Sequence, residues 1–188
     1  MNKRHEPNVR MAVLGCGCWG KNLVRNFAEL GALAAICDTV PATATTLSEK
    51  YGAPAVSLDA IWRDATISGV AIATPAILHA SLAQRALTAG KHVFVEKPLA
   101  LQVDEAEALC ALAEEQDRRL MVGHLLQYHP GFIKLRQLVR DGELGRLQYL
   151  YSNRLNLGKV RREEDIWPAT TEISPQFTIR SQTMTTTH

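Results

Sequence analysis

A short glycine-rich segment carries the clearest chemical signal in this sequence. The letters GCGCWG occupy positions 15 to 20 and directly follow the apolar run Met11 to Leu14. In such a turn Gly15 allows the sharp change of direction, Gly17 lets the backbone approach a phosphate, and Gly20 lets the next helix pack against the strand. The free N–H groups at the start of that helix attract negative charge. The segment therefore predicts a site for a diphosphate.

Neighbouring residues extend this expected site to a whole dinucleotide. Cys18 and Trp19 lie inside the glycine segment and are expected to line the same ligand. Asp38 follows the next apolar run, where a carboxylate can accept hydrogen bonds from ribose hydroxyls and repels a 2′-phosphate. The pattern predicts NAD as the cofactor, in preference to NADP. The alternative is a glycine-rich turn with an unrelated aspartate nearby.

A second chemical group, Glu96-Lys97-Pro98, follows the apolar run His92 to Val95. The carboxyl ends of parallel strands face the ligand crevice, so this pair is expected at the site. The Lys97 amine is a candidate to accept or donate the proton of a substrate hydroxyl. The alternative is a solvated ion pair at the mouth of a loop.

Three further side chains near the expected crevice are weaker candidates. His124 follows the apolar run that ends at Val122, and it is a candidate catalytic residue that assists proton transfer. Tyr128 and His129 come shortly after it and are candidate substrate contacts. A loop residue that binds only backbone or water is the alternative for each.

The elements that must position these residues alternate along the chain between short apolar runs and amphipathic helical stretches. This alternation predicts an α/β fold, a Rossmann-type doubly wound parallel sheet, followed by the start of a second α/β domain. Strands are expected at Met11 to Leu14, Leu33 to Cys37, Val70 to Ala73, His92 to Val95 and Leu120 to Val122, with a short one near Val56.

Two helix starts are predicted from capping signals. Thr74 and Pro75 are expected as N-cap and first residue of a helix from Ala76 to Ala89. Asp104 and Glu107 have the spacing of a capping box.

The pattern changes after Val122. A helix is expected from Pro130 to Val139, and the alternation from Arg146 to Leu155 predicts a half-buried strand of a second sheet. The expected domains are residues 1–123, a partial substrate or oligomerisation domain over residues 124–167, and an irregular threonine-rich tail over residues 168–188.

Composition excludes several classes of protein. The chain has 188 residues, is 46% hydrophobic and carries a net charge of +2 with the two signs interspersed, so a nucleic-acid partner is not expected. No apolar run is long enough to span a membrane, and no signal peptide precedes the first strand. The four cysteines lack CxxC spacing, so no metal site is expected and the predicted location is the cytoplasm.

Several motifs together resemble the glucose-fructose oxidoreductase, inositol dehydrogenase and MocA family: the segment Gly15 to Gly20, Asp38, Thr74-Pro75 with His79, Ala89 to Val93, and Glu96 to Pro98. This resemblance implies an NAD(P)-binding Rossmann domain and a second α/β domain that carries the substrate site. It also implies a homo-oligomer for a full-length form.

The resemblance assigns roles to individual residues. It makes Lys97 the catalytic or substrate-binding lysine and Glu96 a contact to the nicotinamide ribose, while Thr74, Pro75 and His79 would line the cofactor cleft. Similarity is strongest to the branch that oxidises the 3-hydroxyl of UDP-N-acetylglucosaminuronate, over the stretch Trp19 to Phe27 and the segment Gly123 to Gly131. It implies a sugar or nucleotide-sugar substrate.

The sequence departs from this family after Asp165, where the histidine expected in the second domain is missing and the pattern is lost. A truncation or a change of reading frame would explain the departure. Two other interpretations stay open: a dinucleotide-binding remnant without catalysis, and a family fold with an imine-reducing or sensor role.

Overall fold

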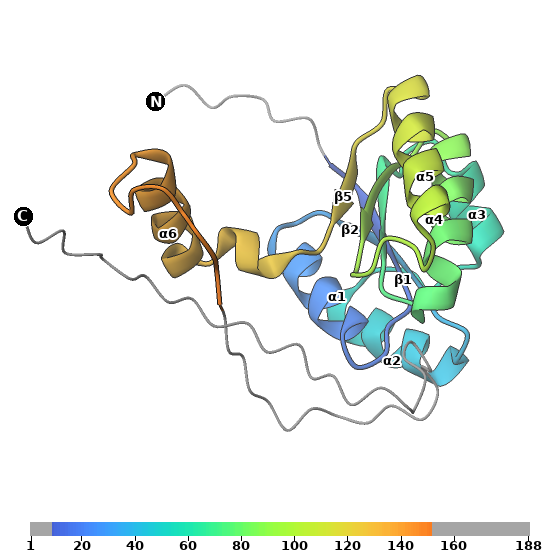
Figure 1. The fold of residues 1–188 in the computed structure, drawn as a ribbon. Coiled ribbons are helices and arrows are strands. Elements are labelled where there is room, and N and C mark those ends of the chain that lie inside the picture. Colours follow the sequence, from blue (N-terminus) through green and yellow to red (C-terminus); the bar gives the residue numbers. More distant parts are fainter. Residues whose placement is uncertain (1–8, 152–188) are drawn as a thin grey trace, which may run out of the picture. The chain divides into compact units, whose positions relative to one another are not determined.

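A five-stranded parallel sheet forms the centre of the structure, a computed structural model that describes residues 9–151 (Figure 1). The strand order is β2-β1-β3-β4-β5. The predicted α/β sheet is confirmed, with β3 shifted by one residue from the expected run. The strands are β1 (Met11–Leu14), β2 (Leu33–Cys37), β3 (Gly69–Ile72), β4 (His92–Val95) and β5 (Leu120–Val122).

The short strand expected near Val56 is a single bridge. Ala55 pairs in parallel with Ile36 of β2, and the Val56 N–H donates to the Ile36 carbonyl at 2.9 Å. Counting this bridge as the third strand along the chain, the spatial order becomes 3-2-1-4-5-6, which is the Rossmann order. The crevice at the reversal point therefore lies between β1 and β3, at their carboxyl ends.

Helices cover both faces of the sheet (Figure 1). Alternate residues of β1 explain the two layers: Ala12 and Leu14 join the core under α3, α4 and α5, whereas Met11 and Val13 join the core under α1 and α2. The helices are α1 (Gly20–Glu29), α2 (Pro41–Tyr51), α3 (Leu58–Arg63), α4 (His79–Thr88) and α5 (Val103–Glu115).

The N-cap prediction at Thr74 was wrong. A short 3-10 helix, η1 (Ala76–Leu78), follows Pro75, and α4 begins only at His79. The Leu78 N–H donates to the Pro75 carbonyl at 2.9 Å, so backbone groups make the turn that the Thr74 side chain was expected to cap.

The predicted capping box at the start of α5 was also wrong, by two residues. The box consists of Gln102 and Glu105, and not of Asp104 and Glu107. Glu105 Oε2 accepts from the Gln102 N–H at 3.3 Å. The apolar periodicity misplaced this start because Val103, the first helical residue, is 75% exposed and does not belong to the buried face.

The described chain divides into two compact units, residues 9–124 and a second unit from Leu125 onward. The second unit contains the 3-10 helix η2 (Leu125–Tyr128) and α6 (Pro130–Arg140), which confirms the expected helix after Pro130. The strand predicted from Arg146 is wrong over residues 146–151, which form no strand: an alternating segment becomes a strand only when another strand pairs with it. The rest of that strand and the expected tail lie outside the described residues.

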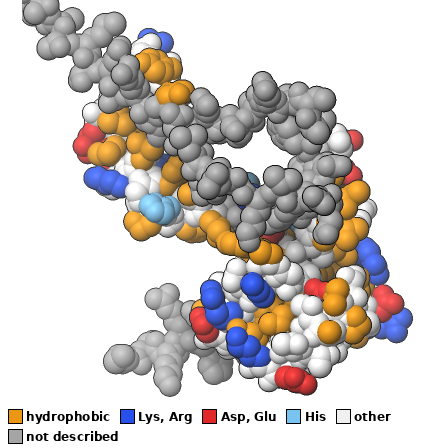
Figure 2. All heavy atoms as spheres, turned by 90° about the horizontal axis from the view of Figure 1, so that it is seen from below, with side chains coloured by type: hydrophobic (Ala, Val, Ile, Leu, Met, Phe, Trp, Pro, Cys, Tyr) orange, Lys and Arg blue, Asp and Glu red, His pale blue; other side chains and the backbone are white. Residues whose placement is uncertain are grey.

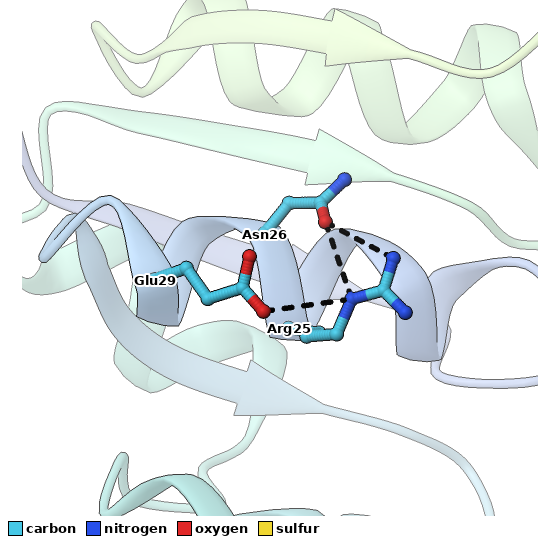
Figure 3. A network of polar contacts seen from close by, with 3 residues as sticks. All are labelled: Arg25, Asn26 and Glu29. Carbon is cyan, nitrogen blue, oxygen red and sulfur yellow. Dashed lines mark hydrogen bonds and ion pairs between the residues drawn. The ribbon is translucent and has the colours of Figure 1, made fainter.

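The outer surface carries charges of both signs. On α1, Arg25 Nε lies 3.8 Å from Glu29 Oε1, and its guanidinium donates to Asn26 Oδ1 (Figure 3). An exposed pair of this kind contributes only about 0.3 to 0.5 kcal/mol, so it marks a solvated helix face. Figure 2 shows Asp and Glu side chains among the Lys and Arg side chains on the visible face. Within residues 9–151, no helix is long and apolar enough to cross a membrane.

Candidate functional site

Two of the three motif glycines are required by packing inside the protein. Gly15 has a φ of +81°, and a Cβ there would lie 2.9 Å from the Ala73 carbonyl carbon. A Cβ on Gly20 would overlap the Gly15 carbonyl oxygen. The glycine loop therefore packs directly on the end of β3, and any side chain at either position would force backbone apart.

The third motif glycine, Gly17, has a different environment. A Cβ at this position would meet no protein atom within 4 Å, and the residue is exposed. Its small size is therefore not demanded by the surrounding protein. It leaves free space beside the N-terminus of α1, where a diphosphate is expected to approach the backbone.

Asp38 connects the end of β2 to the glycine loop. Its Oδ2 accepts from the Cys16 N–H at 2.6 Å, and its Oδ1 accepts from the Val40 N–H at 2.8 Å. A carboxylate has about four acceptor positions, so two remain for the hydroxyls of a ribose. Asp38 thus holds the loop in shape in addition to the ligand contact expected from the sequence.

The cysteines of this region differ in their environment. Burial, followed by the negative charge of Asp38 and then by Cys37, raises the pKa of the Cys16 thiol to about 12. Burial and then Asp38 also raise the pKa of Cys37. Cys18, in the same loop, is exposed. Among the described residues no group of His, Cys, Asp and Glu side chains could hold a metal ion.

We expect iodoacetamide at about pH 8 to alkylate Cys18 and leave Cys16 unmodified, because only an accessible thiolate reacts. Peptide mass spectrometry of the folded protein measures both sites. The exposed Cys110 is the positive control, and urea-denatured protein should be labelled at all of these positions. Equal labelling rates at Cys16 and Cys18 in the folded protein would contradict the assignment.

Three loops meet at the carboxylate of Glu96. The indole Nε1–H of Trp19 donates to Glu96 Oε1 at 2.5 Å, which joins the glycine loop to the turn after β4. A Cβ on Gly123, just after β5, would lie 3.0 Å from Glu96 Oε2. Lys97 is exposed, and within residues 9–151 its amine has no hydrogen-bond or ion-pair partner. Its peptide bond to Pro98 is cis.

His79 lies behind the site and not on its surface. The ring is 2% exposed, with Nδ1 2.6 Å from the Pro98 carbonyl oxygen and Nε2 2.8 Å from the Thr74 carbonyl oxygen. His79 was expected to line the cofactor cleft. The structure instead buries the ring and places both ring nitrogens against backbone carbonyl oxygens. His79 ties together the turns that follow β3 and β4.

Thr74 and Pro75 come directly after β3, at the crevice. Pro75 is exposed, while the Thr74 hydroxyl oxygen is buried and has no hydrogen-bond partner among the described residues. A buried hydroxyl without a partner is costly unless a ligand supplies one. That the two residues line the cofactor cleft stays a prediction.

The remaining candidates divide between the two units. His124 is exposed at the end of the first unit, and its N–H donates to the Val122 carbonyl at 2.7 Å. Tyr128 and His129 belong to the second unit, where His129 Nδ1 caps α6 by accepting from the Gly131 N–H at 3.2 Å. The structure thus gives His129 a helix-capping role that sequence analysis missed, although a histidine before Pro130 was a usable signal.

The segment Ala89 to Val93, which is part of the family resemblance, contains a lysine that lies away from the site. Lys91 is 4% exposed and its Nζ donates to the carbonyls of Asp64 and Ile67 at 2.6 and 2.9 Å. Burial lowers the pKa of this lysine. It lies just before β4, at the amino end of the parallel strands, so its role is to hold the loop before β3.

Comparisons with known proteins agree with this geometry. Residues 9–124 match the profile of the Gfo/Idh/MocA oxidoreductase family, described as having an NAD-binding Rossmann fold. The chain is 34% identical to inositol 2-dehydrogenase of Rhizobium meliloti over 143 residues, which are 74% of this chain and 43% of that protein. It is 32% identical to UDP-N-acetylglucosamine 3-dehydrogenase of Acidithiobacillus ferrooxidans, covering 82% of this chain and 48% of that protein.

A solved structure supports the same relationship. The apo scyllo-inositol dehydrogenase of Lactobacillus casei superposes with a TM-score of 0.70 at 26% identity, covering 76% of this chain and 44% of that one. The chain therefore spans less than half the length of these relatives.

Proposed function

Because the chain belongs to the Gfo/Idh/MocA oxidoreductase family with its NAD-binding Rossmann fold, we propose that residues 9–124 bind NAD and present Lys97 to a hydroxyl of a sugar or nucleotide sugar. The single observation that carries the proposal is the free space at Gly17, between two glycines that are packed against protein. The two relatives compared above are a dehydrogenase of a cyclitol and one of a nucleotide sugar. Both names describe oxidation of a ring hydroxyl.

The described residues fit such a cofactor. Gly17 leaves room for a diphosphate, and Thr74 offers a buried hydroxyl without a partner. Asp38 keeps acceptor positions for a ribose, and its negative charge disfavours the extra phosphate of NADP, which supports NAD as the preferred cofactor. Cys18 and Trp19 would border the diphosphate, and Glu96 would accept from the nicotinamide ribose.

The protein's part in the reaction is positioning and proton transfer. The nicotinamide, when bound, supplies hydride transfer to and from a substrate carbon. The Lys97 amine has no competing partner within residues 9–151, so it can hold the substrate hydroxyl and take its proton. His124 would assist by hydrogen bonding at the same end of the sheet. Tyr128 and His129 remain proposed substrate contacts.

The substrate proposal can be made more specific. The similarity of the stretch Trp19 to Phe27 and of the segment Gly123 to Gly131 to one branch of the family favours UDP-N-acetylglucosaminuronate, oxidised at its 3-hydroxyl. NAD reduction with this compound and with myo-inositol, followed at 340 nm, tests it. NADH binding without turnover of either compound would favour the alternative of a dinucleotide-binding protein without catalysis.

We expect Gly17→Val to abolish NADH binding while leaving the melting temperature of the ligand-free protein within about 2 °C of the wild type. The valine side chain fills space that the protein itself does not use, so folding is unaffected but the diphosphate is excluded. Isothermal titration with NADH and a ligand-free thermal melt measure the two effects.

The matched control is Ala65→Val, an equally small exposed residue in the turn before β3, at the opposite end of the sheet. It should keep wild-type NADH affinity. If Gly17→Val binds NADH as tightly as this control, the diphosphate does not lie at the glycine loop and the proposed site is wrong.

A further inference from the structure

The hydrogen bond between Trp19 and Glu96 joins residues that are 77 positions apart in the sequence, at 2.5 Å. We propose that Trp19 is a positioning residue: its indole N–H fixes the Glu96 carboxylate in the orientation that receives the nicotinamide ribose. This inference rests on the proposed function. It assigns the tryptophan to one half of the cofactor, the nicotinamide half, although it stands in the loop expected to bind the diphosphate.

Two further features bear on where the Glu96 carboxylate lies. Its own backbone N–H donates to the Ile72 carbonyl at 2.9 Å, which fixes the chain at the end of β4 against β3. On the other side, a Cβ on Gly123 would lie 3.0 and 3.1 Å from the two carboxylate oxygens. The carboxylate thus occupies space that any other residue at position 123 would take. The backbone bond thus fixes the main chain of Glu96, Gly123 leaves room for the carboxylate, and the indole binds one carboxylate oxygen.

The choice of tryptophan suits this task. Indole Nε1–H only donates, so it can bind a carboxylate oxygen but cannot compete with it for a hydroxyl proton. Because Trp19 uses Oε1, the other oxygen, Oε2, stays available to accept from a ribose hydroxyl. Without the indole, a glutamate side chain regains several rotamers, and ligand binding must then order it again.

The test compares two ligands that differ in the nicotinamide half. We expect Trp19→Phe, which keeps an aromatic ring and loses the donor, to weaken NADH binding about tenfold, the loss of one hydrogen bond to a charged group. ADP lacks the nicotinamide ribose, so its affinity should stay within about twofold. Isothermal titration measures both ligands independently of tryptophan fluorescence.

A double-mutant cycle shows whether the tryptophan acts through Glu96. In a Glu96→Ala background, Trp19→Phe should cause no further loss of NADH affinity, because the partner is already absent. If the tryptophan were only structural, Trp19→Phe would lower NADH affinity by the same factor in both backgrounds. The control is Trp62→Phe in α3, which should leave the affinity for both ligands unchanged.

Gly123→Ala disturbs the same carboxylate without touching the glycine loop, and it keeps the proposal testable if Trp19→Phe does not fold. It should also weaken NADH binding and leave the affinity for ADP unchanged. Equal losses for NADH and ADP, or wild-type NADH affinity in both variants, would overturn the inference while leaving dinucleotide binding intact. If the wild-type protein binds neither ligand, the proposed function fails and the inference fails with it.

Discussion

Gly20→Ala is expected to destabilise the folded protein by about 3 kcal/mol or more, the upper part of the range for overpacked sites. The new Cβ would overlap the carbonyl oxygen of Gly15 and approach the Ala73 side chain at 3.3 Å. Backbone cannot move aside as a flexible side chain can, so the first turn of α1 must separate from the end of β1. Alanine gains about 1 kcal/mol of helix propensity over glycine, which offsets only part of this cost.

Urea unfolding followed by circular dichroism measures the free energy of unfolding. Gly17→Ala is the matched control: it makes the same chemical change in the same loop, where the added Cβ meets no atom within 4 Å. Its stability should lie within about 0.5 kcal/mol of the wild type. Similar losses in the two variants would show that the loop tolerates no side chain anywhere, and would remove the argument for a ligand space at Gly17.

His79→Ala is expected to lower the free energy of unfolding by about 3 to 5 kcal/mol, through two costs. The substitution leaves a cavity where a 2% exposed imidazole stood, and it removes the ring N–H from the carbonyl oxygens of Thr74 and Pro98, which lie against the two ring nitrogens. The melting temperature should fall by about 10 °C or more. NADH affinity should fall too, since the turns that carry Thr74 and Lys97 lose their connection.

His124→Ala provides the control, because it removes the same side chain from an exposed position in the same unit. It should change stability by less than about 0.5 kcal/mol. A melting temperature for His79→Ala within 3 °C of that control would mean that the contacts of the ring contribute little, and that another contact holds the turns together.

Most strands could be predicted to the residue because each is a short apolar run that ends directly before a polar or glycine residue. Met11 to Leu14 and His92 to Val95 match the observed β1 and β4. Helix starts were less predictable, since they depend on exposed residues such as Val103 that carry no periodic signal. The strand expected from Arg146 to Leu155 was wrong over residues 146–151. Alternating polarity indicates the two faces of a strand, but it does not show whether another strand will pair with it.

The family resemblance inferred from the motifs is confirmed by the match over residues 9–124. The contacts within the candidate site were harder to predict from the sequence. His79 was expected on the surface of the cleft, yet the structure buries it behind two turns. Gly123 was named only as the start of the segment Gly123 to Gly131, and its approach to Glu96 was not predicted, although a glycine directly after a strand was an available signal. In both cases the deciding neighbour, Pro98 or Glu96, is distant in sequence.

The sequence by itself determined the parallel sheet, the glycine loop after its first strand and the family of the protein, because these follow from local patterns of apolar residues and glycines. Only the tertiary structure decided that Gly17 faces free space, that His79 joins two turns, and that Trp19 holds Glu96. Those properties arise between segments that fold together from far apart, and no pattern within one segment encodes which atoms will meet.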